Sequence, residues 1–207
     1  NSCNFAIERT RRIMKQYDIN NDMRYLQLLS QSFPSVAEAS TEIINLQAIL
    51  NLPKGTEHFL ADIHGEYEAF LHVLKNASGN IKRKVNELFG NTLREQDKRE
   101  LCTLIYYPEQ MLEQVKQTEP DINDWYHITL HQLVAVCRDV SSKYTRSKVR
   151  KSLPCDFSYI IQELLHEHTE DHDKTAYVNV IVDTIISTGR ADDFIVAIAN
   201  VIQRLAI

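Results

Sequence analysis

The stretch from Thr56 to Glu66 reads Thr-Glu-His-Phe-Leu-Ala-Asp-Ile-His-Gly-Glu, and it constrains the fold more than any other part of the chain. The turn residues Pro-Lys-Gly come just before it, and its apolar run stops at Asp62. This pattern predicts a short buried strand at about 56–62, then a turn, then a helix that begins near Glu66.

Asp62 and His64 are the residues of this turn that carry chemistry. In an extended turn, residues two apart point the same way, so both side chains can reach one cation. A carboxylate with an imidazole suits Mn²⁺, Fe²⁺ or Zn²⁺, and Gly65 allows a sharp backbone turn beside the ion. The competing interpretation is structural, with Asp62 as the N-cap of the following helix and His64 solvated.

The remainder of the chain favours helices. Only 5 glycines and 5 prolines occur in 207 residues, too few for the frequent turns of a many-stranded β fold. Apolar residues recur at helical spacing. The clearest predicted helices are 4–17, 23–33, 36–50, 67–79, 81–89, 121–144 and 194–205.

Local signals refine the boundaries of these helices. Capping boxes are predicted at Ser35–Glu38 and at Thr92–Glu95, and Pro108 is well placed to begin a helix. The segment Tyr177–Ile186 is ambiguous. Its β-branched residues favour a strand, whereas its length and apolar neighbours favour a buried helix, which we expect.

Composition excludes several classes of partner. The net charge is -5, so bulk electrostatics do not recruit nucleic acid or an anionic membrane. No run of about 18 apolar residues is present, so we expect no membrane span, and we expect a cytoplasmic location because no signal peptide is visible. The cysteines are widely scattered without a Cys-x-x-Cys pair, which favours free thiols.

Three further clusters have competing interpretations. The acidic and histidine-rich run His166–Asp173 is interpreted as a solvated helix end, with adventitious Zn²⁺ or Ni²⁺ binding as the alternative. His127 and His131 share a helix face and are interpreted as partly buried core residues. A basic run is interpreted as a solvated face, with binding of a sugar phosphate or nucleotide as the alternative; it contains Lys143, Arg146, Lys148, Arg150 and Lys151.

The run from Ala39 to Phe70, which contains Gly-Thr-Glu-His-Phe-Leu-Ala-Asp-Ile-His-Gly-Glu, resembles the opening of the class III, Bacillus-type fructose-1,6-bisphosphatases. Tyr-Leu-Gln-Leu-Leu at 25–29 is similar to that family too. These enzymes are calcineurin-like metallophosphoesterases, and Asp-Ile-His matches their first metal motif. The resemblance implies that Asp62 and His64 bind a divalent metal, often Mn²⁺, in a two-metal centre. It also implies hydrolysis of the 1-phosphate of fructose 1,6-bisphosphate in gluconeogenesis.

The sequence departs from that superfamily in one respect. It contains neither a Gly-Asp-x-x-Asp-Arg turn nor a Gly-Asn-His turn. We therefore expect a mainly α chain that is the N-terminal part of an α/β metallophosphoesterase, with an incomplete two-metal centre and no activity of its own. The expected parts are 1–80 with the first strand and metal motif, 81–190 as a helical insertion or cap, and 191–207 as a helix returning to the catalytic core.

Two alternatives to this hypothesis are retained. The chain could be a stand-alone helical interaction or regulatory module with a vestigial metal turn. It could also belong to another phosphoesterase, such as a protein or nucleotide phosphatase, although the long match argues against that. The expected partners are a sugar bisphosphate substrate and, among macromolecules, only a second copy of the chain.

Overall fold

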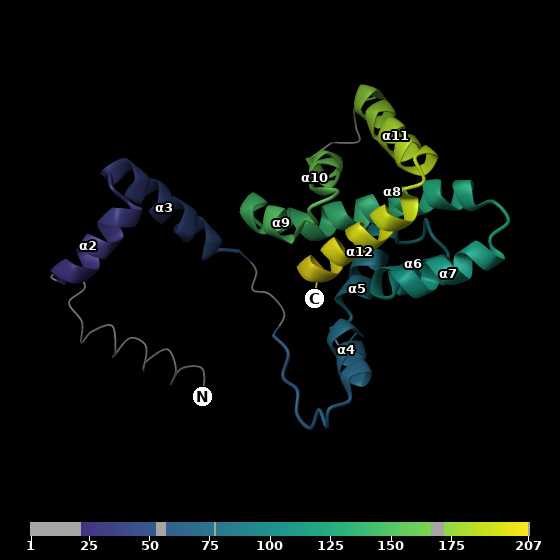
Figure 1. The fold of residues 1–207 in the computed structure, drawn as a ribbon, viewed down its shortest axis with the longest axis horizontal. Helices are drawn as coiled ribbons and strands as arrows, with labels where there is room; N and C mark the ends of the chain where they lie inside the picture. The colour runs from purple at the N-terminus through teal and green to yellow at the C-terminus, as the bar shows by residue number, and fades with distance from the viewer. Residues whose placement is uncertain (1–21, 53–56, 77, 167–171, 207) are drawn as a thin grey trace. The chain divides into compact units, whose positions relative to one another are not determined.

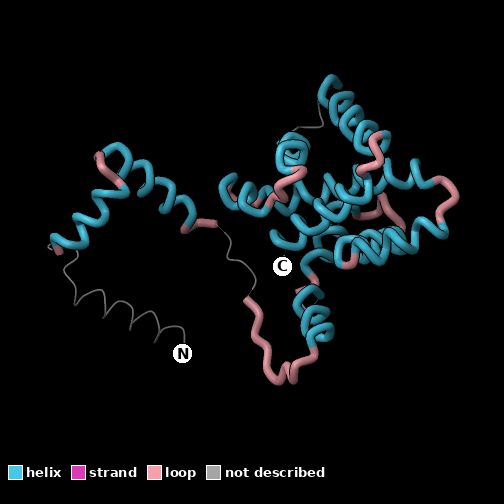
Figure 2. The backbone as a smooth tube through the Cα atoms, viewed as in Figure 1, coloured by secondary structure: helices cyan, strands magenta, loops and turns pink. Residues whose placement is uncertain are grey.

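All regular structure in the described residues is helical, as Figures 1 and 2 show, which confirms the mainly α class. The predicted helix at 4–17 and most of the run His166–Asp173 lie outside these residues. The computed structural model describes residues 22–52, 57–76, 78–166 and 172–206. No described helix is long and apolar enough to cross a membrane.

The chain divides into two compact units, Asn1–Leu52 and Pro53–Ile207. In the first, α2 (Met23–Ser32) and α3 (Val36–Ile49) are each capped by a side chain. The capping box of α3 is complete and confirms the prediction: Ser35 Oγ accepts from the Glu38 N–H at 3.2 Å, and the Glu38 carboxylate accepts from the Ser35 N–H at 3.1 Å.

Neither α2 nor α3 contains a buried residue. The apolar stripe of α3 faces solvent, with Val36 84% and Leu50 78% exposed. In the described structure these two helices are therefore stabilised by their caps and their own backbone hydrogen bonds, and not by buried side chains.

The second unit is a bundle organised around α8 and α12, which lie against each other (Figure 1). α12 also packs against α5, α6, α7, α9 and α11, and α8 packs against α5, α6, α10 and α11. The helix that we expected to return to a catalytic core thus packs here inside the bundle. The elements are α4 (Tyr67–Asn76), α5 (Asn80–Phe89), α6 (Glu95–Tyr106), α7 (Pro108–Thr118), α8 (Ile122–Ser142), α9 (Arg146–Ser152), α10 (Ser158–His166), α11 (His172–Ser187) and α12 (Ala191–Ala206).

Aliphatic side chains at helical spacing fill the centre of the bundle. On α8, Leu130, Leu133 and Cys137 are fully buried. On α12, Phe194 is fully buried and meets the ring of Phe157 edge to face, with 5.2 Å between centroids. Burial of each large apolar side chain contributes about 1.5–3 kcal/mol, so this seam is the main source of stability.

Two local predictions are wrong. Residues 57–63 form neither strand nor helix, and Phe59 is 90% exposed, so the buried strand at 56–62 is not formed. A strand must pair its N–H and C=O groups with another strand, and the described residues offer none. The capping box at Thr92–Glu95 is also absent, because the Thr92 hydroxyl donates to the Phe89 carbonyl at 2.5 Å and α6 begins only at Glu95.

The remaining boundary predictions hold. Pro108 begins α7, and Gly90 ends α5. The ambiguous segment Tyr177–Ile186 is helical within α11, with Val178 and Val182 buried against the core. Packing on the aliphatic bundle therefore outweighs the strand preference of its β-branched residues.

The core seam predicts a large difference between two identical substitutions. Phe194→Ala should lower the free energy of unfolding by about 3–5 kcal/mol, because it removes a fully buried ring. Phe59→Ala, the matched control at an exposed ring, should change it by less than about 0.5 kcal/mol. Denaturant unfolding followed by circular dichroism measures both, and equal effects would contradict the assignment of the core.

The cysteines should react in the order of their burial. Burial raises the pKa of the Cys102 thiol to about 11 and that of Cys137 to about 12, whereas Cys155 is exposed. Because the thiolate is the nucleophile, a disulfide reagent at pH 8 should label Cys155 first, Cys102 slowly and Cys137 only after unfolding. A Cys3→Ser background simplifies the count, and rapid labelling of Cys137 in the folded chain would contradict this order.

Candidate metal centre

The turn that carries the candidate ligands has an unusual backbone. Asp62 and His64 have φ angles of +55° and +52°, and Gly65 follows with +76°. The Glu66 N–H donates to the Ile63 carbonyl at 3.1 Å and closes the turn. The extended turn that we expected is therefore not the observed conformation, because both candidate ligands have left-handed backbone.

Left-handed backbone is costly for residues other than glycine. The cost is about 1–2 kcal/mol for most residue types, and aspartate and histidine tolerate it better than β-branched ones. Backbone outliers of this kind cluster at ligand-binding and active sites. The N-cap alternative for Asp62 is wrong, because α4 begins only at Tyr67.

The donor set fits part of a divalent metal site. Asp62 and His64 are exposed and supply one carboxylate and one imidazole, which are ligands of Mn²⁺, Fe²⁺ or Zn²⁺. Within the described part of the chain, no group of three or more His, Cys, Asp or Glu side chains is placed to hold a metal. The assignment of Asp62 and His64 as metal ligands therefore stays a prediction.

His58, just before the turn, is a further polar group near the candidate ligands. It is half-buried, and its Nε2 atom is shielded from solvent without a hydrogen-bond partner in the described residues. A buried ring nitrogen of this kind normally finds a partner. The sequence carries no signal that the ring nitrogen of His58 would be shielded while the next residue, Phe59, is exposed.

Polar contacts from α4 attach the turn to the bundle. His72 Nδ1 and the Tyr107 hydroxyl form a hydrogen bond of 2.6 Å, and their rings stack. Lys75 Nζ donates to the Tyr106 carbonyl, and Asn76 Nδ2 donates to the Tyr107 hydroxyl, both at 3.1 Å. Since α4 contains no buried residue, these contacts at the α6–α7 junction position the segment that follows the candidate ligands.

The paired histidines of α8 are placed as the sequence predicts. The His127 and His131 rings stack 6.1 Å apart, and His127 Nε2 lies 2.5 Å from Asp183 Oδ1 of α11. Burial lowers the pKa of His131, the neighbouring His127 and Arg138 lower it further, and Asp183 acts in the opposite direction. This environment favours a neutral imidazole at the helix interface.

With this geometry established, comparison with known proteins identifies the family. The family model described as Firmicute fructose-1,6-bisphosphatase matches residues 24–207, so the chain belongs to that family. The match includes Asp62 and His64 and all of the helical bundle. No solved structure matches the chain.

Curated relatives agree with this assignment. The fructose-1,6-bisphosphatase class 3 of Phocaeicola vulgatus is 76% identical over 91% of this chain and 28% of that protein. That of Bacteroides fragilis is 76% identical over 90% of this chain and 28% of that protein. That of Clostridium botulinum is 61% identical over 94% of this chain and 30% of that protein. The chain therefore spans less than a third of the length of these relatives.

The environment of His131 predicts acid sensitivity of the fold. Its pKa is below the usual 6.5 when folded, so the unfolded chain takes up the proton first and stability falls as the pH drops through that range. His131→Gln should flatten this dependence, by less than the limit of about 1.4 kcal/mol per pH unit for one proton. This slope is measured by denaturant unfolding at a series of pH values between 7.5 and 5.5, each set to within about 0.1 unit.

His166→Gln is the matched control, because His166 is exposed at the end of α10. It should leave the slope of unfolding free energy against pH unchanged. An unchanged slope in His131→Gln would contradict the assignment.

Proposed function

We propose that this chain is part of a metal-dependent fructose-1,6-bisphosphatase of gluconeogenesis. The reaction is hydrolysis of the 1-phosphate of fructose 1,6-bisphosphate to fructose 6-phosphate and phosphate. The family match over residues 24–207 carries this proposal, and the printed names of the curated relatives support it. A metabolic reaction of this kind fits the cytoplasmic location that the sequence predicts.

Asp62 and His64 are the proposed metal ligands, with Mn²⁺ as the preferred ion. Such a metal, when bound, polarises a phosphoryl group and activates water. The Asp62 carboxylate would balance part of the ion's charge, and the neutral His64 imidazole would be a terminal ligand. Gly65, with its φ of +76°, keeps the backbone beside these two residues in a conformation that a larger residue would strain.

The rest of the active site is proposed to lie outside the described residues. Pairing with strands of an α/β phosphoesterase domain would give segment 56–62 the partners that it lacks here. In this proposal 1–80 belongs to that domain, 81–190 is a helical insertion or cap, and 191–207 leads back to it. The 207 residues alone should have little or no phosphatase activity, because their two proposed ligands cannot complete a dinuclear centre.

A second candidate function is an interaction module that keeps a vestigial metal turn. The exposed apolar stripe of α3 favours it, since surfaces of this kind mark contacts with other proteins or domains. This candidate predicts no metal binding at Asp62, which the following experiment tests.

Titration of the chain with Mn²⁺ tests the proposed ligands. Binding, followed by calorimetry or by the electron paramagnetic resonance signal of free Mn²⁺, should weaken by at least about tenfold in Asp62→Asn and in His64→Gln. Glu68→Gln, an exposed carboxylate on α4, is the control and should bind as the parent does.

Phosphate release from fructose 1,6-bisphosphate is measured in the same samples. Release near background would agree with an incomplete centre. Robust Mn²⁺-dependent release that is lost in Asp62→Ala would contradict the proposed inactivity, and unchanged Mn²⁺ affinity in both ligand variants would contradict the site.

A further inference from the structure

A pocket of about 330 Å³ opens where the end of α8, the short helix α9 and helix α10 meet. None of its residues belongs to the Asp62–His64 turn. Its polar lining comes from three successive segments between Ser141 and His166. These groups include Ser142, Arg146, Arg150, Gln162 and His166.

The charge of this pocket is unbalanced. Arg146 and Arg150 lie one helical turn apart on α9, both are exposed, and neither has an ion-pair partner in the described part of the chain. No residue that lines the pocket is a carboxylate. Like charges at this spacing repel, and an anion held between them would remove that repulsion.

Two lysines add to the positive charge at the same place. The ammonium groups of Lys148 and Lys143 lie 3.9 Å and 5.3 Å from the centre of the Tyr144 ring, which also lines the pocket. Because lysines already occupy this ring, it is poorly placed to stack on an aromatic ligand. The local excess of positive charge stands against a net charge of -5 for the whole chain.

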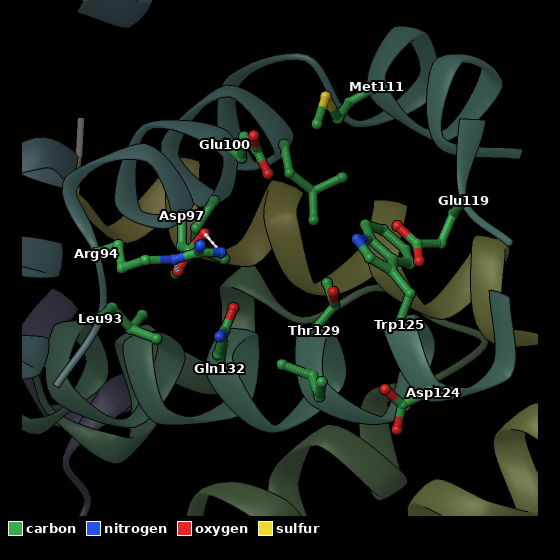
Figure 3. Close-up of a pocket in the computed structure, with 13 residues that line it drawn as sticks. Leu93, Arg94, Asp97, Glu100, Met111, Glu119, Asp124, Trp125, Thr129 and Gln132 are labelled. Atoms are coloured by element: carbon green, nitrogen blue, oxygen red, sulfur yellow. Dashed lines mark hydrogen bonds and ion pairs between the residues drawn. The ribbon is translucent and has the colours of Figure 1, made fainter. Parts of the chain in front are cut away.

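Two other pockets of similar size lack this character. The pocket in Figure 3, of about 350 Å³, is lined by four carboxylates, and its one arginine, Arg94, is paired with Asp97 at 2.9 Å. In a third, of about 390 Å³, the buried Lys98 is paired with Glu95 at 2.7 Å. Among these three pockets, only the one at α9 presents cations without a carboxylate in its lining.

We propose that the pocket at α9 binds a small phosphate-bearing molecule. A guanidinium is a planar fork that donates two parallel hydrogen bonds to a phosphate, so Arg146 and Arg150 can grip one phosphoryl group from two sides. The volume is that of a metabolite site, and Val149, Leu153 and Leu165 offer an apolar wall to its organic part. This site is additional to the proposed phosphatase centre and does not depend on it.

Calorimetric titration of the 207-residue chain with inorganic pyrophosphate tests the proposal. The buffer contains a chelator and fixed salt, so that no metal at Asp62 can recruit the probe. The chain should bind pyrophosphate saturably, and Arg146→Gln with Arg150→Gln should weaken binding by at least about tenfold, since each charged hydrogen bond contributes roughly that factor.

The matched control is the double variant Arg94→Gln with Arg190→Gln. It changes the net charge equally, but these arginines pair with Asp97 and Asp193 elsewhere in the bundle. It should bind pyrophosphate as the parent does, and so should Asp62→Asn. Absence of saturable binding, or equal weakening in the control, would overturn the proposal.

Two further measurements keep the test decisive. The double variant Arg146→Lys with Arg150→Lys preserves the charge but removes the planar guanidinium groups, so it should bind pyrophosphate more weakly than the parent. Parent-like affinity would overturn bidentate binding of the phosphate by these arginines. Glucose 6-phosphate and cytidine 5′-monophosphate distinguish a sugar phosphate from a nucleotide as the natural ligand. Glucose and cytidine without phosphate should not bind, and saturable binding of either would overturn the requirement for phosphate.

Discussion

The contact between α8 and α12 is the interaction on which the second unit depends. Each helix presents fully buried aliphatic side chains to the other, and nearly every other helix of the bundle packs on one or both. Polar contacts join both ends of α12 to neighbouring helices. Asp192, at the start of α12, accepts a hydrogen bond of 2.6 Å from the Tyr126 hydroxyl of α8 and pairs with Lys116 of α7. Gln203, near the end of α12, donates to the Ile105 carbonyl of α6 at 2.6 Å.

This arrangement separates two kinds of surface. The buried aliphatic side chains of the bundle pack against one another and form its core. By contrast, the segment with the candidate ligands and the helices of the first unit expose apolar side chains, among them Phe59 and Val36. The curated relatives that the chain matches are more than three times as long as the chain.

How far the sequence predicted the structure depends on how local each feature is. Helical periodicity located the core helices, and the ambiguous segment 177–186 was correctly expected to be helical. The capping box was predicted correctly at Ser35 and wrongly at Thr92, where the hydroxyl donates to the Phe89 carbonyl instead. The strand at 56–62 failed because pairing is a property of the partner strand and not of the segment. Of the candidate site, Asp62 and His64 were identified by spacing and resemblance, but their left-handed backbone and the shielded His58 nitrogen were not predictable from a pattern.

The polar attachment of α4 has a consequence for motion. His72, Lys75 and Asn76 hold this helix by hydrogen bonds, and α4 contains no buried residue, so we expect α4 to detach locally before the aliphatic seam unfolds. Hydrogen bonds of this kind exchange readily with water, so the opening requires little free energy compared with global unfolding. The Asp62–His64 turn lies just before α4, so we expect its position to adjust with α4 while the aliphatic seam stays folded.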